Sequence, residues 1–160
     1  VILTTNIKKL GKIGELVKDF ELTDHLGEKN NLYSYLDKKL VIFFYPKANT
    51  PGCTAQACNL NDNYKILLNK GFNIIGVSAD EVKNQKKFVD KYSFSFPLIA
   101  DSKKELINYF GVWGPKKFMG KEYEGIIRTT FILGENKKIE EIINKVKTKD
   151  HTQQIIDLYT

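Results

Sequence analysis

The chain has 160 residues, of which 42% are hydrophobic and 28% charged, so it is long enough for one domain with a sizeable core and too apolar for wholesale disorder. It has no apolar run of the roughly 18 residues that a membrane span needs, and residues 1–14 lack the apolar stretch of a signal peptide. The formal net charge is +6, but the lysines are spread from Lys8 to Lys149 with acidic residues between them, which favours a solvated surface and only weakly supports a nucleic-acid partner.

Apolar runs and helical periodicities alternate along the chain. Residues 40–45 (LVIFFY) form a continuous apolar, β-branched and aromatic run, which is typical of a strand buried on both faces. Residues 54–70 follow with apolar side chains at helical spacing. The remaining predicted elements are, in chain order, a strand at 73–78, a helix at 81–92, a short strand at 96–99, a helix at 103–110, a strand at 129–133, its hairpin partner at 138–146 and a closing helix at 151–159.

This alternation predicts an α/β fold with a mixed central β-sheet flanked by helices. The sequence has no internal repeat, low-complexity segment or interdomain linker. We therefore expect a single domain over residues 1–160, in which residues 1–13 are a candidate for a flexible lead-in.

The segment that carries chemistry is residues 45–58, YPKANTPGCTAQAC. It begins where the strand at 40–45 ends, and Cys53 falls in the first turn of the helix that follows. Catalytic groups of open α/β sheets gather at the carboxyl ends of strands. The unpaired N–H groups and partial positive charge of a helix N-terminus favour a thiolate. Cys53 is therefore the candidate nucleophile.

Two other residues of this segment have two interpretations each. Thr50 either caps the helix or donates its hydroxyl to the reacting site. Pro46 either shields the thiolate from water or only ends the strand. The residues by themselves leave both choices open.

A helix N-terminus alone is too weak to ionise a thiol at neutral pH. A free thiol has a pKa near 8.5, and lowering it to about 6 requires roughly 3.4 kcal/mol at about 1.4 kcal/mol per unit. A helix terminus supplies about 0.3 to 2 kcal/mol, so a fixed cation is also needed. Arg128 is the only arginine among 25 basic residues, and it precedes a predicted strand that can lie beside the one at 40–45. Its planar fork of donors makes it the candidate for this cation.

Cys58 lies five residues after Cys53. In a regular helix this spacing gives a Cα separation of about 8.6 Å, whereas a disulfide requires about 4.4–6.8 Å. The two cysteines can therefore pair only if the first turns of the helix unwind. Cys53 shares the apolar side of the helix with Ala57 and Leu60, whereas Cys58 falls on the polar side. Cys58 is either a resolving thiol or a bystander.

Residues 46–58, PKANTPGCTAQAC, resemble the PxxxTxxC signature of the peroxiredoxins, with Pro46, Thr50 and Cys53 at its defined positions. The TPGCT string with a second Cys five residues after the first is similar to the bacterioferritin-comigratory-protein (PrxQ) branch. The similarity covers nearly the whole chain from residue 14 onward and continues through IIGVSAD (74–80), FPLIAD (96–101), YFGVWG (109–114) and GIIRTTFIL (125–133).

The resemblance implies a thioredoxin-like fold and an atypical 2-Cys peroxidase that reduces hydrogen peroxide and organic hydroperoxides. It implies that Cys53 is oxidised to a sulfenic acid, that Thr50 and Arg128 hold the peroxide oxygens, and that Pro46 shields the thiolate. It also implies that Cys58 resolves the sulfenic acid as an intramolecular disulfide, which thioredoxin or glutaredoxin reduces, with no metal or other cofactor. We expect a monomer that is cytoplasmic by default, with the nucleus or an organelle as open alternatives.

The chain departs from this branch at positions that leave the Pro-Thr-Cys-Arg set intact. Gln56 stands where an acid is usual, Asn61 where Arg is common, Gln85 where His is frequent, and Lys18 where Pro is usual. These departures leave open which reductant is used and how easily the helix unwinds.

Other functions fit the residues less well. A disulfide oxidoreductase without peroxidase activity would share the fold, but it normally uses C-x-x-C. A cysteine hydrolase needs a His partner, and we expect both His25 and His151 to lie on the surface. These histidines and the two cysteines do not have metal-ligand spacing. A nucleic-acid-associated protective role stays open only as an addition to the peroxidase.

Overall fold

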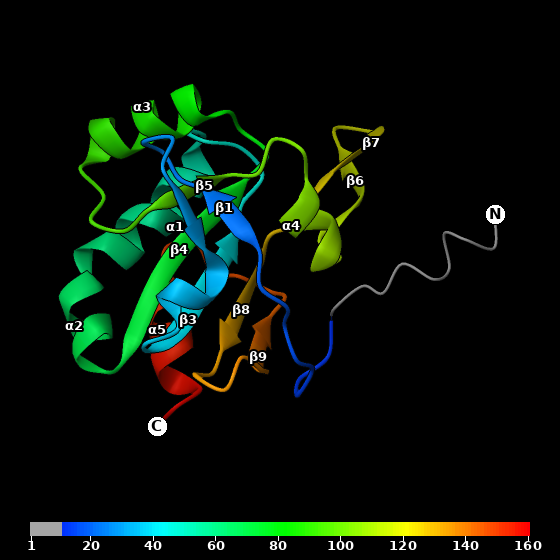
Figure 1. The fold of residues 1–160 in the computed structure, drawn as a ribbon. Coiled ribbons are helices and arrows are strands. Elements are labelled where there is room, and N and C mark those ends of the chain that lie inside the picture. Colours follow the sequence, from blue (N-terminus) through cyan, green and yellow to red (C-terminus); the bar gives the residue numbers. More distant parts are fainter. Residues whose placement is uncertain (1–10) are drawn as a thin grey trace.

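A five-stranded mixed sheet lies at the centre of the structure, a computed structural model that describes residues 11–160 (Figure 1). Its strand order is β5-β4-β3-β8-β9, in which β3, β4 and β5 are parallel and β8 runs antiparallel to both β3 and β9. The strands are β3 (Lys39–Phe44), β4 (Phe72–Ser78), β5 (Leu98–Ala100), β8 (Thr129–Leu133) and β9 (Ile139–Ile143). The predicted α/β fold with a mixed central sheet is thus confirmed, including the hairpin of β8 and β9.

The helices are α1 (Pro51–Asp62), α2 (Tyr64–Asn69), α3 (Val82–Tyr92), α4 (Glu105–Tyr109) and α5 (His151–Asp157). The prediction of one continuous helix up to residue 70 was wrong, because the helix is interrupted at Asn63, whereas its start at Pro51 places Cys53 in the first turn as predicted. The side-chain amide of Asn63 donates to the backbone oxygen of Asn59 at 2.8 Å. Such local bonds from Asn compete with the helical hydrogen-bond ladder, which explains the break.

The central sheet separates two apolar cores because successive side chains of a strand point to opposite faces. On β3, Val41 and Phe43 face one core, whereas Leu40, Ile42 and Phe44 face the other. Helices α1, α2, α3 and α5 contribute buried side chains to the first core, and α4 contributes to the second. Burial on both faces is why residues 40–45 show no polar alternation.

Two hairpins and a short 3-10 helix were not predicted. They are β1 (Glu21–Thr23) with β2 (Lys29–Asn31), β6 (Trp113–Phe118) with β7 (Lys121–Ile126), and η2 (Leu32–Tyr35). Figure 1 shows the β6–β7 hairpin standing away from the central sheet. Most side chains of these strands are exposed, so their sequences lack the apolar runs that mark a buried strand.

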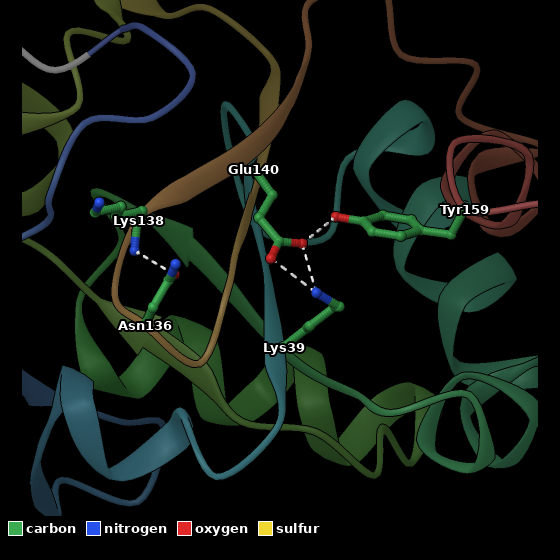
Figure 2. A network of polar contacts seen from close by, with 5 residues as sticks. All are labelled: Lys39, Asn136, Lys138, Glu140 and Tyr159. Atoms are coloured by element: carbon green, nitrogen blue, oxygen red, sulfur yellow. Dashed lines mark hydrogen bonds and ion pairs between the residues drawn. The ribbon is translucent and has the colours of Figure 1, made fainter.

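A network of hydrogen bonds and an ion pair lies at the end of the sheet where β3 begins (Figure 2). Lys39 Nζ lies 2.7 Å from both carboxylate oxygens of Glu140 on β9, and the Tyr159 hydroxyl donates to the same carboxylate at 2.8 Å. In the neighbouring turn, the backbone N–H of Lys138 donates to Asn136 Oδ1 at 3.2 Å. This network fastens the residues after α5 to the sheet, at the end opposite the carboxyl end of β3.

Among residues 11–160, no helix is long and apolar enough to cross a membrane. Of the proposed lead-in at residues 1–13, residues 1–10 lie outside the described part of the chain, and residues 11–13 are exposed.

Candidate active site

Cys53 lies in the first turn of α1, directly beyond the carboxyl end of β3. Pro51 occupies the first helical position, where its missing N–H costs no hydrogen bond. The first helical bond runs from the N–H of Thr54 to the oxygen of Thr50 at 2.8 Å. The Cys53 side chain is only 1% exposed and packs into the core that lies under α1.

Arg128 is brought to Cys53 by the register of the sheet. Thr129 pairs with Phe44, so the residue before β8 arrives at the end where β3 stops. The guanidinium then contacts two residues of α1: Nη2 lies 3.4 Å from Cys53 Sγ, and Nη1 donates to Gln56 Oε1 at 2.6 Å. A charge-assisted contact of this kind stabilises an anionic sulfur over a neutral one.

Gly52 leaves room for this guanidinium. A Cβ atom at this position would lie 3.2 Å from Arg128 Nη2. The glycine therefore permits the close approach of the arginine to the first turn of α1.

Gln56 is a site residue whose contact the sequence did not predict. It is completely buried, and because a guanidinium can only donate, its amide oxygen must be the atom that faces Arg128. Its Nε2 has no hydrogen-bond partner among the described residues. Its spacing of three residues from Cys53, on the same side of a helix, is the signal that could have identified it.

Lys116 on β6 is a second cation near the site. It is half-buried, and its Nζ donates to the backbone oxygen of Ile126 at 2.9 Å. Burial, together with the charge of Arg128, lowers the pKa of Lys116, and the nearby Cys53 opposes this shift. Lys116 and Arg128 also line the same open cleft. The β6–β7 hairpin was not predicted, so no sequence pattern pointed to this lysine.

Thr50 and Pro46 lie in the loop between β3 and α1. Thr50 is the N-cap residue, but its side chain makes no capping bond, and its hydroxyl donates instead to the oxygen of Lys47 at 2.8 Å. The interpretation of Thr50 as a side-chain cap is therefore wrong. Pro46 is half-buried and directly follows the fully buried Tyr45.

A buried polar network holds this loop in place. Asp80 Oδ2 accepts from the backbone N–H of Ala48 at 2.8 Å and from the hydroxyl of Ser78 at 2.6 Å. Gln85 Nε2 donates to the same hydroxyl at 2.9 Å, and the Tyr45 hydroxyl donates to Gln85 Oε1. The network links the ends of β3 and β4 to α3. It therefore attaches the loop that precedes Cys53 to the end of the central sheet.

Cys58 lies in the same uninterrupted helix as Cys53, and both thiols are free. Its side chain is half-buried and packs against the core under α1, so its assignment to the polar side of the helix was wrong. Burial, with a smaller contribution from Asp62, raises the pKa of the Cys58 thiol. While the helix is intact, this thiol is therefore mostly protonated at neutral pH.

The hydrogen bonds of the two histidines go to groups other than Cys53. His25 is half-buried, and its Nδ1 accepts from the N–H of Leu98 at 3.4 Å. His151 is completely buried, which contradicts its predicted surface position, because it hydrogen-bonds Thr130 on β8 across the core. Among residues 11–160, no group of three His, Cys, Asp or Glu side chains could hold a metal ion.

Comparisons with known proteins agree with this geometry. Residues 13–142 match the AhpC/TSA family. The chain is 38% identical over 146 residues to peroxiredoxin Bcp of Escherichia coli, covering 91% of this chain and 94% of the relative. It is 39% identical over 145 residues to peroxiredoxin Bcp of Bacillus subtilis, covering 91% and 92%.

Solved structures give the same relationship. A mutant of Xylella fastidiosa PrxQ superposes with a TM-score of 0.87 at 29% identity, over 94% of this chain and 96% of that one. Peroxidoxin BcpB of Mycobacterium tuberculosis gives a TM-score of 0.81 at 33% identity, over 91% and 94%. With a thioredoxin-like fold and a buried thiol beside its one arginine, the chain belongs to the AhpC/TSA family and is a thiol-dependent peroxidase of the Bcp/PrxQ peroxiredoxins.

Proposed function

We propose that Cys53 is the peroxidatic thiolate and that it reduces hydrogen peroxide and organic hydroperoxides. The observation that carries this assignment is the contact of 3.4 Å between Arg128 Nη2 and Cys53 Sγ at the start of α1. Helix N-terminus and guanidinium act together on one sulfur, as its ionisation requires.

In the first step, the Cys53 sulfur attacks one peroxide oxygen. An S–O bond forms, the O–O bond breaks, and the departing oxygen takes a proton and leaves as water or an alcohol. The product at Cys53 is a sulfenic acid. The cations Arg128 and Lys116 stabilise the negative charge that develops on the departing oxygen.

Thr50 and Pro46 act on the substrate side of the same step. The Thr50 hydroxyl uses its hydrogen toward Lys47, so its lone pairs are free to accept from the O–H of a hydroperoxide. Pro46 has no N–H and restricts the access of water to the thiolate. Together they orient the peroxide and limit competing solvation.

In the second step, the Cys58 thiol attacks the sulfenic sulfur, a disulfide forms, and water leaves. Because five helical residues separate the two Cα atoms by about 8.6 Å, α1 must unwind before the bond can form. Unwinding of the first turn uncovers the Cys58 sulfur and reduces the burial that raises the pKa of this thiol, so a larger fraction of it is ionised when it attacks. A dithiol reductant of the thioredoxin or glutaredoxin class then restores both thiols.

The test is peroxide consumption with a thioredoxin system, combined with the intact mass of the oxidised protein. Cys53→Ser should abolish peroxide consumption. Cys58→Ser should complete one turnover, retain the mass of a sulfenic acid and lose thioredoxin-driven cycling. Equal cycling by Cys58→Ser and the unaltered chain would refute the intramolecular resolving step.

A second variant tests the electrostatic argument. Arg128→Lys removes the guanidinium that contacts the Cys53 sulfur and the Gln56 amide at the same time. A hydrogen bond to a charged group contributes about 1.5–3 kcal/mol. The single-turnover rate of peroxide attack should therefore fall on the order of 10- to 100-fold. An unchanged rate, with unchanged dependence on pH, would show that Arg128 does not act on the thiolate.

A further inference from the structure

The half of α1 that contains Cys58 is fastened to α5 through Asn59. Asn59 Oδ1 accepts from the backbone N–H of Thr152 at 2.8 Å, and its Nδ2 donates to the oxygen of Lys149 at 3.1 Å. The Thr152 hydroxyl donates in return to the oxygen of Asn59 at 3.2 Å. The N-cap residue of α5, Asp150, makes no side-chain cap bond, so Asn59 supplies from another helix the acceptor that a cap normally provides.

The start of α5 is itself fixed to the central sheet. The fully buried His151 contacts the Thr130 hydroxyl of β8 through Nε2 at 2.8 Å and Gln154 Oε1 through Nδ1 at 2.9 Å. The same Oε1 also accepts from the N–H of Lys147, which fixes it as an acceptor. Nδ1 of His151 therefore carries the proton, and Nε2 accepts from Thr130. Asn59 is thus connected to the central sheet indirectly, because it is bonded to α5 and α5 is bonded to β8.

A second contact holds the end of α1 from the opposite side. Asn61 Oδ1 accepts from the N–H of Ser95 at 2.8 Å, and Leu60 between the two asparagines is completely buried. The turn that follows Cys58 is thus attached on two sides and packed on a third.

The first turn of α1 is attached differently, because one of its main attachments is the reacting sulfur. Arg128 contacts Cys53 Sγ, and a hydrogen bond to an ionised group is roughly twice as strong as one to a neutral group. Conversion of the thiolate to a neutral sulfenic acid removes that charge. The oxidation therefore weakens the attachment at Cys53 and leaves the bonds of Asn59 unchanged.

We propose that Asn59 is a positioning residue for the resolving step, which keeps Cys58 stationary on α5 so that the first turn of α1 unwinds and Cys53 moves to Cys58. The inference rests on the proposed resolving role of Cys58 and adds which part of the helix moves. In this scheme, oxidation of Cys53 by peroxide itself weakens the attachment of the first turn of α1, which is the part of the helix that has to move.

Hydrogen exchange of individual amides measures which half opens. After oxidation to the disulfide, the amides of residues 54–57 should exchange faster, whereas those of residues 59–62 and of α5 should keep their protection. The sulfenic acid form of Cys58→Ser should show the same early loss of protection at residues 54–57 without any disulfide. Equal loss of protection in residues 59–62 and in α5 of the oxidised chain would overturn the proposal.

Variants of Asn59 separate positioning from general stability. Asn59→Ala should leave the rate of peroxide attack unchanged and slow the later formation of the disulfide by about 3- to 10-fold, because Cys58 is then no longer held in the place that Cys53 reaches. Asn59→Asp retains an acceptor for the N–H of Thr152 and should return the rate to near that of the unaltered chain. Gln153→Ala, an exposed change on α5 outside these bonds, is the matched control.

The outcomes distinguish the inference from the proposed function beneath it. If mass measurement of the unaltered chain shows no disulfide between Cys53 and Cys58, the resolving role fails, and this inference fails with it. If the disulfide forms at the same rate in Asn59→Ala as in Gln153→Ala, only the role of Asn59 is refuted. If Asn59→Ala does not fold, the exchange pattern of the unaltered chain decides.

Discussion

Cys53 and Gln56 contact the same guanidinium, so a charge introduced at position 56 would act on the proposed peroxidatic sulfur. The neutral amide orients Arg128 through Nη1 and takes none of its charge, which leaves the full cation to Cys53. A carboxylate at the same position would orient the arginine equally well but would place an anion beside the thiolate. The Gln56 amide thus orients Arg128 without neutralising the positive charge of the guanidinium.

Gln56→Glu tests this point with almost no change of shape. Side chains three residues apart on a helix lie about 5–6 Å apart at Cβ, where two like charges repel by roughly 3 kcal/mol at an effective dielectric constant of about 20. With part of that repulsion cancelled by Arg128, the rate of peroxide attack at neutral pH should fall about 10-fold, and its pH profile should move upward. Stopped-flow single-turnover kinetics across pH measure both. Gln153→Glu, which adds the same charge at an exposed position of α5, should leave the profile in place.

At the scale of elements, the order of the strands assembles the site. The antiparallel placement of β8 beside β3 brings Arg128 to the carboxyl end of β3, and parallel β4 ends beside it with the residues that hold the loop before Cys53. Close packing around the central strands maintains that arrangement. Gly76 on β4 is closely packed between core side chains, because a Cβ atom there would lie 2.6 Å from Phe43 Cζ and 2.7 Å from Leu98 Cδ2.

Gly76→Ala should therefore destabilise the fold. Both neighbouring side chains are completely buried and cannot move aside without disturbing the core, and overpacking of this kind costs about 1–3 kcal/mol. Urea unfolding followed by circular dichroism should show a lower midpoint with an unchanged slope. Gly11→Ala is the control, since nothing lies within 4 Å of a Cβ atom there. Equal stability of the two variants would contradict the packing argument.

At the scale of the whole molecule, His151 couples stability to pH. Burial lowers the pKa of His151 below the usual value of about 6.5. The unfolded chain therefore binds a proton at a higher pH than the folded chain does, and the free energy of unfolding decreases as the pH falls from about 6.5 to the lower folded pKa. Above pH 7 the imidazole is neutral in both states, and this contribution to stability is fully present.

His151→Gln should flatten this part of the pH dependence. The difference in unfolding free energy between the unaltered chain and the variant should shrink on acidification, with a slope of at most about 1.4 kcal/mol per pH unit. Half-buried Asp101, whose pKa partial burial raises to about 6, loses its contribution to stability as the pH rises and so acts in the opposite direction. It is present in both proteins, so it cancels in the difference. A constant difference from pH 5 to 8 would contradict the assignment.

Strong local patterns explain why much of the fold could be predicted. The apolar runs at 40–45 and 129–133 mark strands buried on both faces, and apolar side chains at helical spacing mark the helix that follows the first of them. Prediction from the sequence failed for segments with a weak pattern. The exposed strand β2, with the sequence KNN, and the break of the long helix at Asn63 depend on partners elsewhere in the chain or on a single side-chain bond.

By itself, the sequence determined the sheet, the position of Cys53 at a helix N-terminus and the peroxiredoxin signature, because these follow from local periodicity and from residues close together in the chain. The sequence also indicated Arg128 as the candidate cation for this sulfur, because it is the only arginine. Only the tertiary structure decided how Arg128 contacts Cys53 and Gln56 together, that Lys116 lies near them, and what holds the helix. Arg128, Lys116 and Thr152, which binds Asn59, come from segments more than fifty residues from α1 in the chain. Such contacts depend on strand order, register and burial, which no local pattern encodes.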